Sequence, residues 1–224
     1  MPWKTKLRLV TDLSMVIVLL LLMSYSLLGE TAHEWIGIVM FLLFILHHGI
    51  NSSWIRNLRG GKYTVSRLVR TVIDMLILFT MLGSMLSGIV ISRHIFSFLP
   101  FGPEAGETGR AVHMFFAFWG FILMCLHGGM HLKMIAGMIH KDRGKTEGRM
   151  FSLCALLAVV YGACAFYRRQ IISYLFLQTH FLMLGFDETL ASYLFDYFMI
   201  MIFFMWIGYH LDKILKYNVK GKMR

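Results

Sequence analysis

Six long apolar stretches constrain this chain more than any other feature of its sequence. Each is close to the roughly 20 helical residues that cross a hydrocarbon core about 30 Å thick. Because water does not reach backbone amides there, and the stretches lack internal proline and the alternating pattern of a barrel, we expect helices. The expected spans are residues 10–29, 33–55, 70–92, 110–138, 150–167 and 189–211.

Composition supports an all-α integral membrane protein with the lipid bilayer as its first partner. The chain of 224 residues is 58% hydrophobic and only 15% charged, which excludes a water-soluble globule. The net charge of +10 does not predict a nucleic-acid partner, because the basic residues stand between apolar blocks rather than on one polar surface. The three cysteines lack the spacing of a zinc site, and no C-x-x-C-H motif for covalent haem is present.

The distribution of lysine and arginine predicts the orientation. If the N-terminus is cytoplasmic, only four of the 22 basic residues fall on the outer side: Arg93, Arg110, Arg168 and Arg169. The positive-inside rule then places both termini in the cytoplasm. The short apolar run 171–186 is expected to be an interfacial or re-entrant helix on the outer face, and residues 10–29 a retained helix rather than a signal peptide.

Ten histidines in so apolar a chain need an explanation, because ionisable groups at membrane depth usually face the bundle interior and mark a functional site. His33 and His47 lie on the second expected helix, and His113 and His127 on the fourth. Both spacings are fourteen residues. Fourteen residues are two heptads, so both members of each spacing should face the same neighbouring helix.

The second and fourth expected helices run in the same direction, so their histidines should meet in two pairs. The outer pair is His33 with His113, and the inner pair is His47 with His127, about 21 Å apart along the helix axis. Two facing imidazoles can fill both axial positions of a haem iron, which leaves no open position and suits electron transfer. Zinc is a weaker alternative, because four histidines spread over about 21 Å cannot share one ion.

Three further histidines leave the ligand assignment open. His48 adjoins His47, and His131 lies one turn beyond His127, so either can replace its neighbour as a ligand, bind a haem propionate or line a quinone pocket. His94, at the outer end of the third expected helix, either neutralises propionates or is simply solvated. We also expect a capping box from Thr31 to Glu34 at the start of the second helix.

These residues resemble the flavinylation-associated cytochrome family of bacterial membrane proteins. The resemblance covers about residues 10–138 and is carried by HEWIG at 33–37, LHHGIN at 46–51, SRHIFSFLP at 92–100, VHM at 112–114, WGF at 119–121 and LH at 126–127. The paired spacings are more distantly similar to the di-haem core of respiratory cytochrome b. The resemblance implies two non-covalent b-type haems in the bacterial cytoplasmic membrane and a separate extracytoplasmic flavoprotein as partner.

The sequence therefore predicts a six-helix membrane cytochrome. Residues 1–145 are expected to form a cytochrome b-like four-helix haem-binding core, and residues 146–224 a C-terminal helical pair with the outer interfacial helix. The expected role is that of an electron-transfer component of an oxidoreductase system. The alternatives are a quinone-oxidising anchor subunit of a larger oxidoreductase and a haem-free transporter with a histidine relay. The pattern indicates neither the direction of electron flow nor an oligomeric state.

Overall fold

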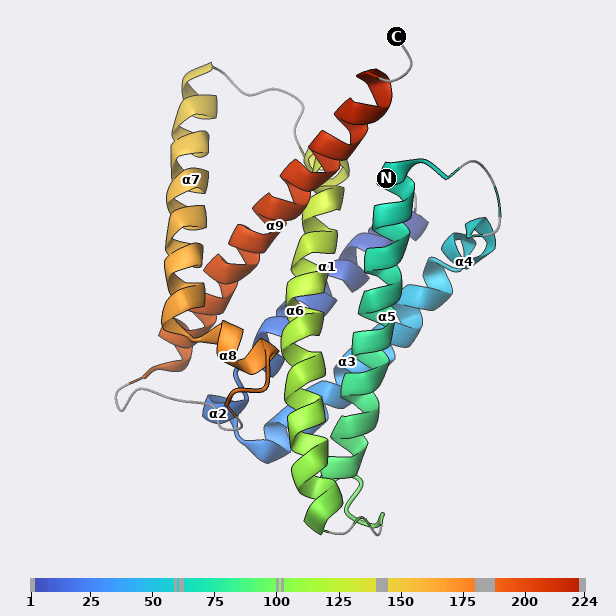
Figure 1. Ribbon diagram of the computed structural model, residues 1–224, viewed down its shortest axis with the longest axis vertical. Coiled ribbons are helices and arrows are strands. Elements are labelled where there is room, and N and C mark those ends of the chain that lie inside the picture. The colour runs from blue at the N-terminus through green and yellow to red at the C-terminus, as the bar shows by residue number, and fades with distance from the viewer. Residues whose placement is uncertain are drawn as a thin grey trace.

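The computed structural model describes residues 3–58, 60, 63–99, 101, 103–139, 145–179 and 188–221. Within these ranges every regular element is a helix, which confirms the all-α class (Figure 1). The helices are α1 (Trp3–Met23), α2 (Tyr25–Leu28), α3 (Glu30–Ile50), α4 (Ser53–Asn57), α5 (Val65–Ile91), α6 (Pro103–Ile139), α7 (Lys145–Arg168), α8 (Ile171–Leu175) and α9 (Leu190–Gly221).

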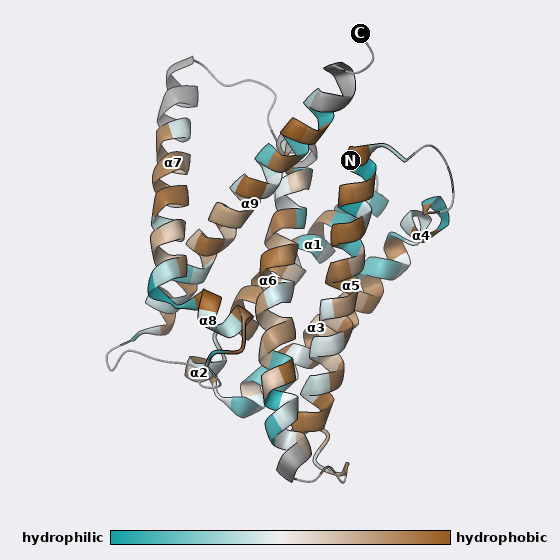
Figure 2. Cartoon of the chain, in the orientation of Figure 1, coloured by the Kyte–Doolittle hydropathy of each residue, from teal (hydrophilic) through white to brown (hydrophobic). Residues whose placement is uncertain are grey.

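Four helices are long and apolar enough to cross a membrane: Glu30–Ile50, Val65–Ile91, Ala105–Leu132 and Leu190–Tyr217. Figure 2 shows hydrophobic residues along much of α5 and α6, with hydrophilic residues gathered near helix ends. The two other expected spans are also helical, as α1 and α7, but α1 carries several charges and the apolar part of α7 is short. The chain is thus a plausible multi-pass membrane protein with four spans, and the count of six stays a prediction.

Most of the main helix contacts join helices that follow one another in the chain, and the contact of α6 with α9 is the exception. α1 packs against α3, α5 packs against α6, and α9 crosses both α6 and α7 (Figure 1). By contrast, α3 makes only slight backbone contact with α5. The histidine-bearing helices α3 and α6 therefore belong to two separate hairpins, each packed within itself.

Glycine permits the close crossing of α6 and α9. A Cβ built on Gly129 would overlap the backbone carbonyl of Met205, and one built on Gly208 would overlap the backbone carbonyl of Leu126. The two backbones can approach this closely only because neither position carries a side chain. α9 is therefore fixed against α6 by backbone contact.

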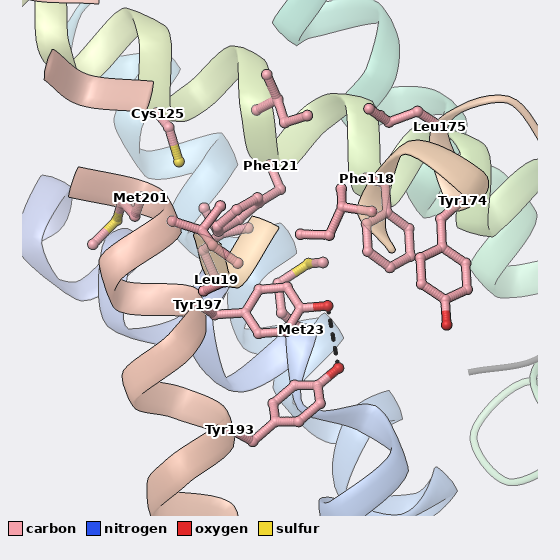
Figure 3. Packing of buried hydrophobic residues seen from close by; sticks show 14 of the residues in the cluster. Leu19, Met23, Phe118, Phe121, Cys125, Tyr174, Leu175, Tyr193, Tyr197 and Met201 are labelled. Atoms are coloured by element: carbon pink, nitrogen blue, oxygen red, sulfur yellow. Dashed lines mark hydrogen bonds between the residues drawn. The ribbon is translucent and has the colours of Figure 1, made fainter. Parts of the chain in front are cut away.

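The buried core lies where α1, α6, α8 and α9 meet (Figure 3). Phe121 and Tyr197 are almost fully buried there, and the Tyr193 hydroxyl donates to the Tyr197 hydroxyl at 3.2 Å. This one cluster contains residues from both sides of residue 145. The C-terminal helices thus share a core with the helices that carry the paired histidines.

α8 packs against α6 at the start of the run that was expected to be interfacial. The Tyr174 ring stacks on Phe118 with 4.6 Å between ring centres, and the Trp119 indole donates to the Leu175 carbonyl at 3.0 Å. Ile171 is fully buried. Residues 180–187 lie outside the described part of the chain, so the interfacial helix as a whole stays a prediction.

A buried acid joins α7 and the turn after it to α9. Asp196 is 2% exposed and accepts hydrogen bonds from Arg168, Arg169 and the Tyr161 hydroxyl at 2.7–2.8 Å. Arg169 also forms an ion pair with Glu188. Because the carboxylate is surrounded by donors, its charge is compensated inside the helix bundle.

The predicted capping box at the second span is wrong. α3 begins at Glu30 and follows Gly29, whose φ of 83° sets the turn, and no side chain caps the helix. The Glu34 carboxylate instead accepts the Ser92 hydroxyl at 2.7 Å and the backbone N–H groups of residues 93–95 at 2.8–3.3 Å. Glu34 therefore ties the segment after α5 to the first turns of α3.

Candidate functional site

The structure brings the outer pair together. The ring centres of His33 on α3 and His113 on α6 lie 6.0 Å apart, with the ring planes inclined by 77°. Two imidazoles that each bind one metal at about 2 Å have ring centres roughly 6 Å apart. The spacing of the outer pair is therefore one that a single iron can bridge.

The surroundings of His113 determine which of its nitrogens is free. Its Nδ1 lies 2.9 Å from the Ser84 carbonyl and 3.2 Å from the Ser87 hydroxyl, both on α5. A carbonyl oxygen only accepts, so Nδ1 carries the proton and Nε2 keeps the lone pair. Histidines that bind metals are commonly oriented by such a bond from their second nitrogen. His113 thus has the tautomer that a haem ligand requires.

His33 has an incompletely satisfied ring. Its Nδ1 is buried and has no hydrogen-bond partner among the described residues. The ring also makes an edge contact with Tyr25, with 5.1 Å between ring centres. A buried polar atom without a partner costs about 1–3 kcal/mol, so its retention beside His113 needs a reason. A group bound between the two imidazoles would supply one.

The inner histidines are held by carboxylates. The Nδ1 atom of His47 lies 2.8 Å from Asp12 on α1, and that of His127 lies 2.7 Å from Asp74 on α5. Asp74 also accepts the indole N–H of Trp54 at 3.1 Å. Since a carboxylate accepts the proton-bearing nitrogen, both inner rings keep Nε2 for a ligand. The described contacts join each inner histidine to an acid and do not include a ring contact between the two.

The alternative inner ligands lie beside the predicted ones. His48 is 5.4 Å from His47 between ring centres, and its Nδ1 lies 2.9 Å from the Phe44 carbonyl. His131 is 4.7 Å from His127. Both neighbours stay close enough to exchange roles with the predicted ligands, so the choice within each adjacent pair stays a prediction.

His94 lies apart from the paired histidines. It is exposed, and its backbone N–H donates to Glu34. Its ring has no contact with the outer pair among the described interactions. The expected role toward a haem propionate therefore stays a prediction.

The backbones of α3 and α6, which carry the histidines, differ in how closely atoms of other elements approach them. A Cβ on Gly37, one turn beyond His33 on α3, would meet no atom within 4 Å. One on Gly120 of α6 would meet the Thr80 side chain at 3.4 Å. The α3 side of the site is therefore the open side, where a flat group can approach the backbone.

Sequence reasoning missed the groups that orient the histidines. Asp12, Asp74, Ser84 and Ser87 had no assigned role toward them. An acid within an apolar stretch was the available signal for the two aspartates. Their partners lie 35 and 53 residues away, so the pairings become visible only once the helices are placed.

No family model, curated protein or solved structure matches the chain. The functional conclusion accordingly depends on the residues of the site and their geometry.

Proposed function

We propose that the protein is a di-haem membrane cytochrome that transfers electrons across the bilayer. The observation that carries the proposal is the outer pair, in which two imidazoles lie 6.0 Å apart and one has its tautomer fixed by the Ser84 carbonyl. With both histidines bound, a haem iron would have no position open for a further ligand. Such a centre exchanges electrons rather than binding oxygen or a substrate.

The donor set favours haem over a bare metal ion. The described residues contain no group of three or more His, Cys, Asp or Glu that could hold a metal. A structural zinc ion needs about four protein ligands. A haem would need only two ligands from the protein, and a histidine pair would provide that number.

In this proposal His33 and His113 hold one haem, and His47 and His127 hold the other. The haems supply one-electron chemistry when bound. The chain positions the imidazoles: α5 holds His113 and His127 through Ser84 and Asp74, and α1 holds His47 through Asp12. The helices α1, α3, α5 and α6 form the haem-binding core of the proposal.

We propose that α1 and α7 also cross the bilayer, which gives six spans in a bacterial cytoplasmic membrane with both termini inside. In support, the two ends of the described chain and α4 lie at the same end of the molecule (Figure 1). A cysteine introduced at Ser97 should react with an impermeant thiol reagent from the outside, whereas one at Ser52 should react only after the membrane is opened.

The proposed partner is a separate extracytoplasmic flavoprotein that accepts or supplies electrons at the outer pair. A quinone-oxidising anchor subunit keeps the haems but predicts reduction by added quinol. A haem-free histidine relay is the second candidate, because His127 contacts both Asp74 and His131. That candidate predicts a colourless protein.

A reduced-minus-oxidised visible spectrum of the purified protein, with haem measured per chain, tests the proposal. We expect two haems in the wild type and one in each of His33→Ala and His113→Ala. His210→Ala is the matched control, because its ring contacts Trp206 and Tyr209 rather than another histidine, and it should retain both haems. A colourless wild type from haem-replete cells would overturn the proposal in favour of the relay.

A further inference from the structure

The two pairs differ in what their second nitrogens contact. At the inner pair, both Nδ1 atoms face carboxylates, Asp12 at 2.8 Å and Asp74 at 2.7 Å. At the outer pair, the Nδ1 of His113 faces a neutral carbonyl and a hydroxyl, and no carboxylate hydrogen-bonds to the His33 ring among the described contacts. Anionic acceptors are thus confined to one pair.

An anionic acceptor changes the ligand more than a neutral one. A carboxylate draws the Nδ1 proton toward itself, which makes Nε2 the more basic ligand and places negative charge beside the metal. Both effects stabilise the ferric over the ferrous state and lower the reduction potential. The effect is larger where water is excluded, and the Asp74 side chain is 18% exposed against 53% for Asp12.

Among the described contacts, the other charged side chains near the two pairs make no hydrogen bond to a ring nitrogen of these histidines. Glu34 follows His33 in sequence, but its oxygens accept hydrogen bonds from residues 92–95 rather than from a ring nitrogen. Near the inner pair, Arg70 is paired with Asp212, which also pairs with Lys216 at 2.7 Å. The carboxylates that contact imidazole directly remain the distinguishing charges.

We propose that Asp12 and Asp74 make the inner pair the more reducing of the two sites, so that an electron passes from the inner pair to the outer pair. The inference rests on the proposed function and adds a direction to it. The transfer moves one electron: the inner site is oxidised, the outer site is reduced, and no bond or proton is exchanged.

A redox titration of the purified holoprotein, followed by its visible spectrum, tests this order. Two potentials are expected, and the single-haem variants assign them: His113→Ala should retain the lower and His127→Ala the higher. Asp74→Asn keeps an oxygen that can accept the Nδ1 proton but removes the charge. It should raise the lower potential enough to change the reduced-to-oxidised ratio at least tenfold, which is about 59 mV for one electron.

Further variants separate the effect of the carboxylate charge on the potential from the effect of a structural change. Asp12→Asn should shift the lower potential in the same direction by less, because the Asp12 side chain is more exposed than that of Asp74. Asp74→Glu should restore the wild-type value, and Ser87→Ala should leave the lower potential unchanged. The low-spin ferric signal of the inner site in electron paramagnetic resonance should shift in both Asn variants.

The outcomes distinguish the two levels of the proposal. A protein without haem overturns both the proposed function and the order. Two haems whose lower potential is unmoved in both Asn variants overturn the order and leave the function standing. If the lower potential belongs to the outer pair, the order is likewise overturned and the function stands. If Asp74→Asn fails to assemble, Asp12→Asn alone decides, because its aspartate lies at the exposed surface.

Discussion

α6 meets α9 and α3 in different ways. The closed seam is its contact with α9, where Gly129 and Gly208 let the two backbones touch. The open seam is its approach to α3, where His33 and His113 meet while a Cβ on Gly37 would meet nothing. The same helix is thus held by backbone packing on one side and left accessible to a bound group on the other.

The difference shows how a membrane helix can be rigid and still offer a site. Between helices in lipid, stability comes mainly from van der Waals packing, because lipid tails are as apolar as leucine. The closed seam supplies that packing around Phe121 and Tyr197. The open seam therefore needs no comparable packing, and its polar rings can be positioned for ligands.

The largest predicted effect on stability is the difference between losing Asp196 on α9 and losing Asp74 on α5. Asp196 compensates Arg168 and Arg169, which stay charged at any accessible pH, whereas Asp74 faces a histidine that can be neutral. We expect Asp196→Ala to lower the free energy of unfolding by about 3–5 kcal/mol, because it leaves the half-buried Arg169 with only one of its two described carboxylate partners.

Denaturant unfolding in detergent measures this effect, with Asp74→Ala as the comparison. A larger loss for Asp74→Ala than for Asp196→Ala would contradict the contrast between the two acids.

The closed seam should be broken by a single methyl group. Gly129→Ala places a Cβ against the Met205 carbonyl, so α9 must move away, at about 1–3 kcal/mol. Gly128→Ala is the matched control, because its Cβ would meet only the Met205 methyl group at 3.5 Å. Thermal unfolding should show a lower midpoint for the first variant and little change for the second. Equal midpoints would be incompatible with the close crossing.

The open seam should be loosened through Glu34. Glu34→Ala removes the acceptor for the Ser92 hydroxyl and the following backbone N–H groups, and we expect a loss of about 1–2 kcal/mol. Because these bonds tie α3 to the end of α5, the haem proposed at the outer pair should also be lost first.

Glu30→Ala is the control for Glu34→Ala, since the contacts of the Glu30 side chain within the described residues, with Tyr25 and Arg93, are both long at 3.4 Å. Haem content and the free energy of unfolding should be measured for both variants. Equal losses in the two would contradict the role given to Glu34.

The smallest effect is expected at Gly37. With nothing within 4 Å, a methyl group is accommodated, and alanine in a helix is favoured over glycine by about 0.5–1 kcal/mol. Gly37→Ala should therefore leave the unfolding midpoint unchanged or slightly raised. Gly37→Leu, in contrast, should reduce haem content if the macrocycle lies against α3. Destabilisation by the alanine variant would show that the open seam is packed.

Length and apolarity were enough to predict where the helices lie, because a helix in lipid must bond its own backbone. The spacing of the histidines placed His33 opposite His113, and their rings do lie 6.0 Å apart. The same reasoning could not find Asp12 and Asp74, whose partners are distant in sequence. The prediction of a capping box was wrong because Gly29 sets the start of α3. Glu34 instead accepts hydrogen bonds from donors that follow α5.

The closed seam also has a consequence for the order in which the protein is assembled. The histidine-bearing hairpins, α1 with α3 and α5 with α6, are each made of neighbours in the chain and can pair as they leave the ribosome. Gly208 lies on α9, which follows α6, α7 and α8 in the chain, so Gly129 stays uncovered until α9 has been synthesised. The histidine-bearing side of the bundle can thus form first, and the opposite side of α6 is closed only when α9 packs against it.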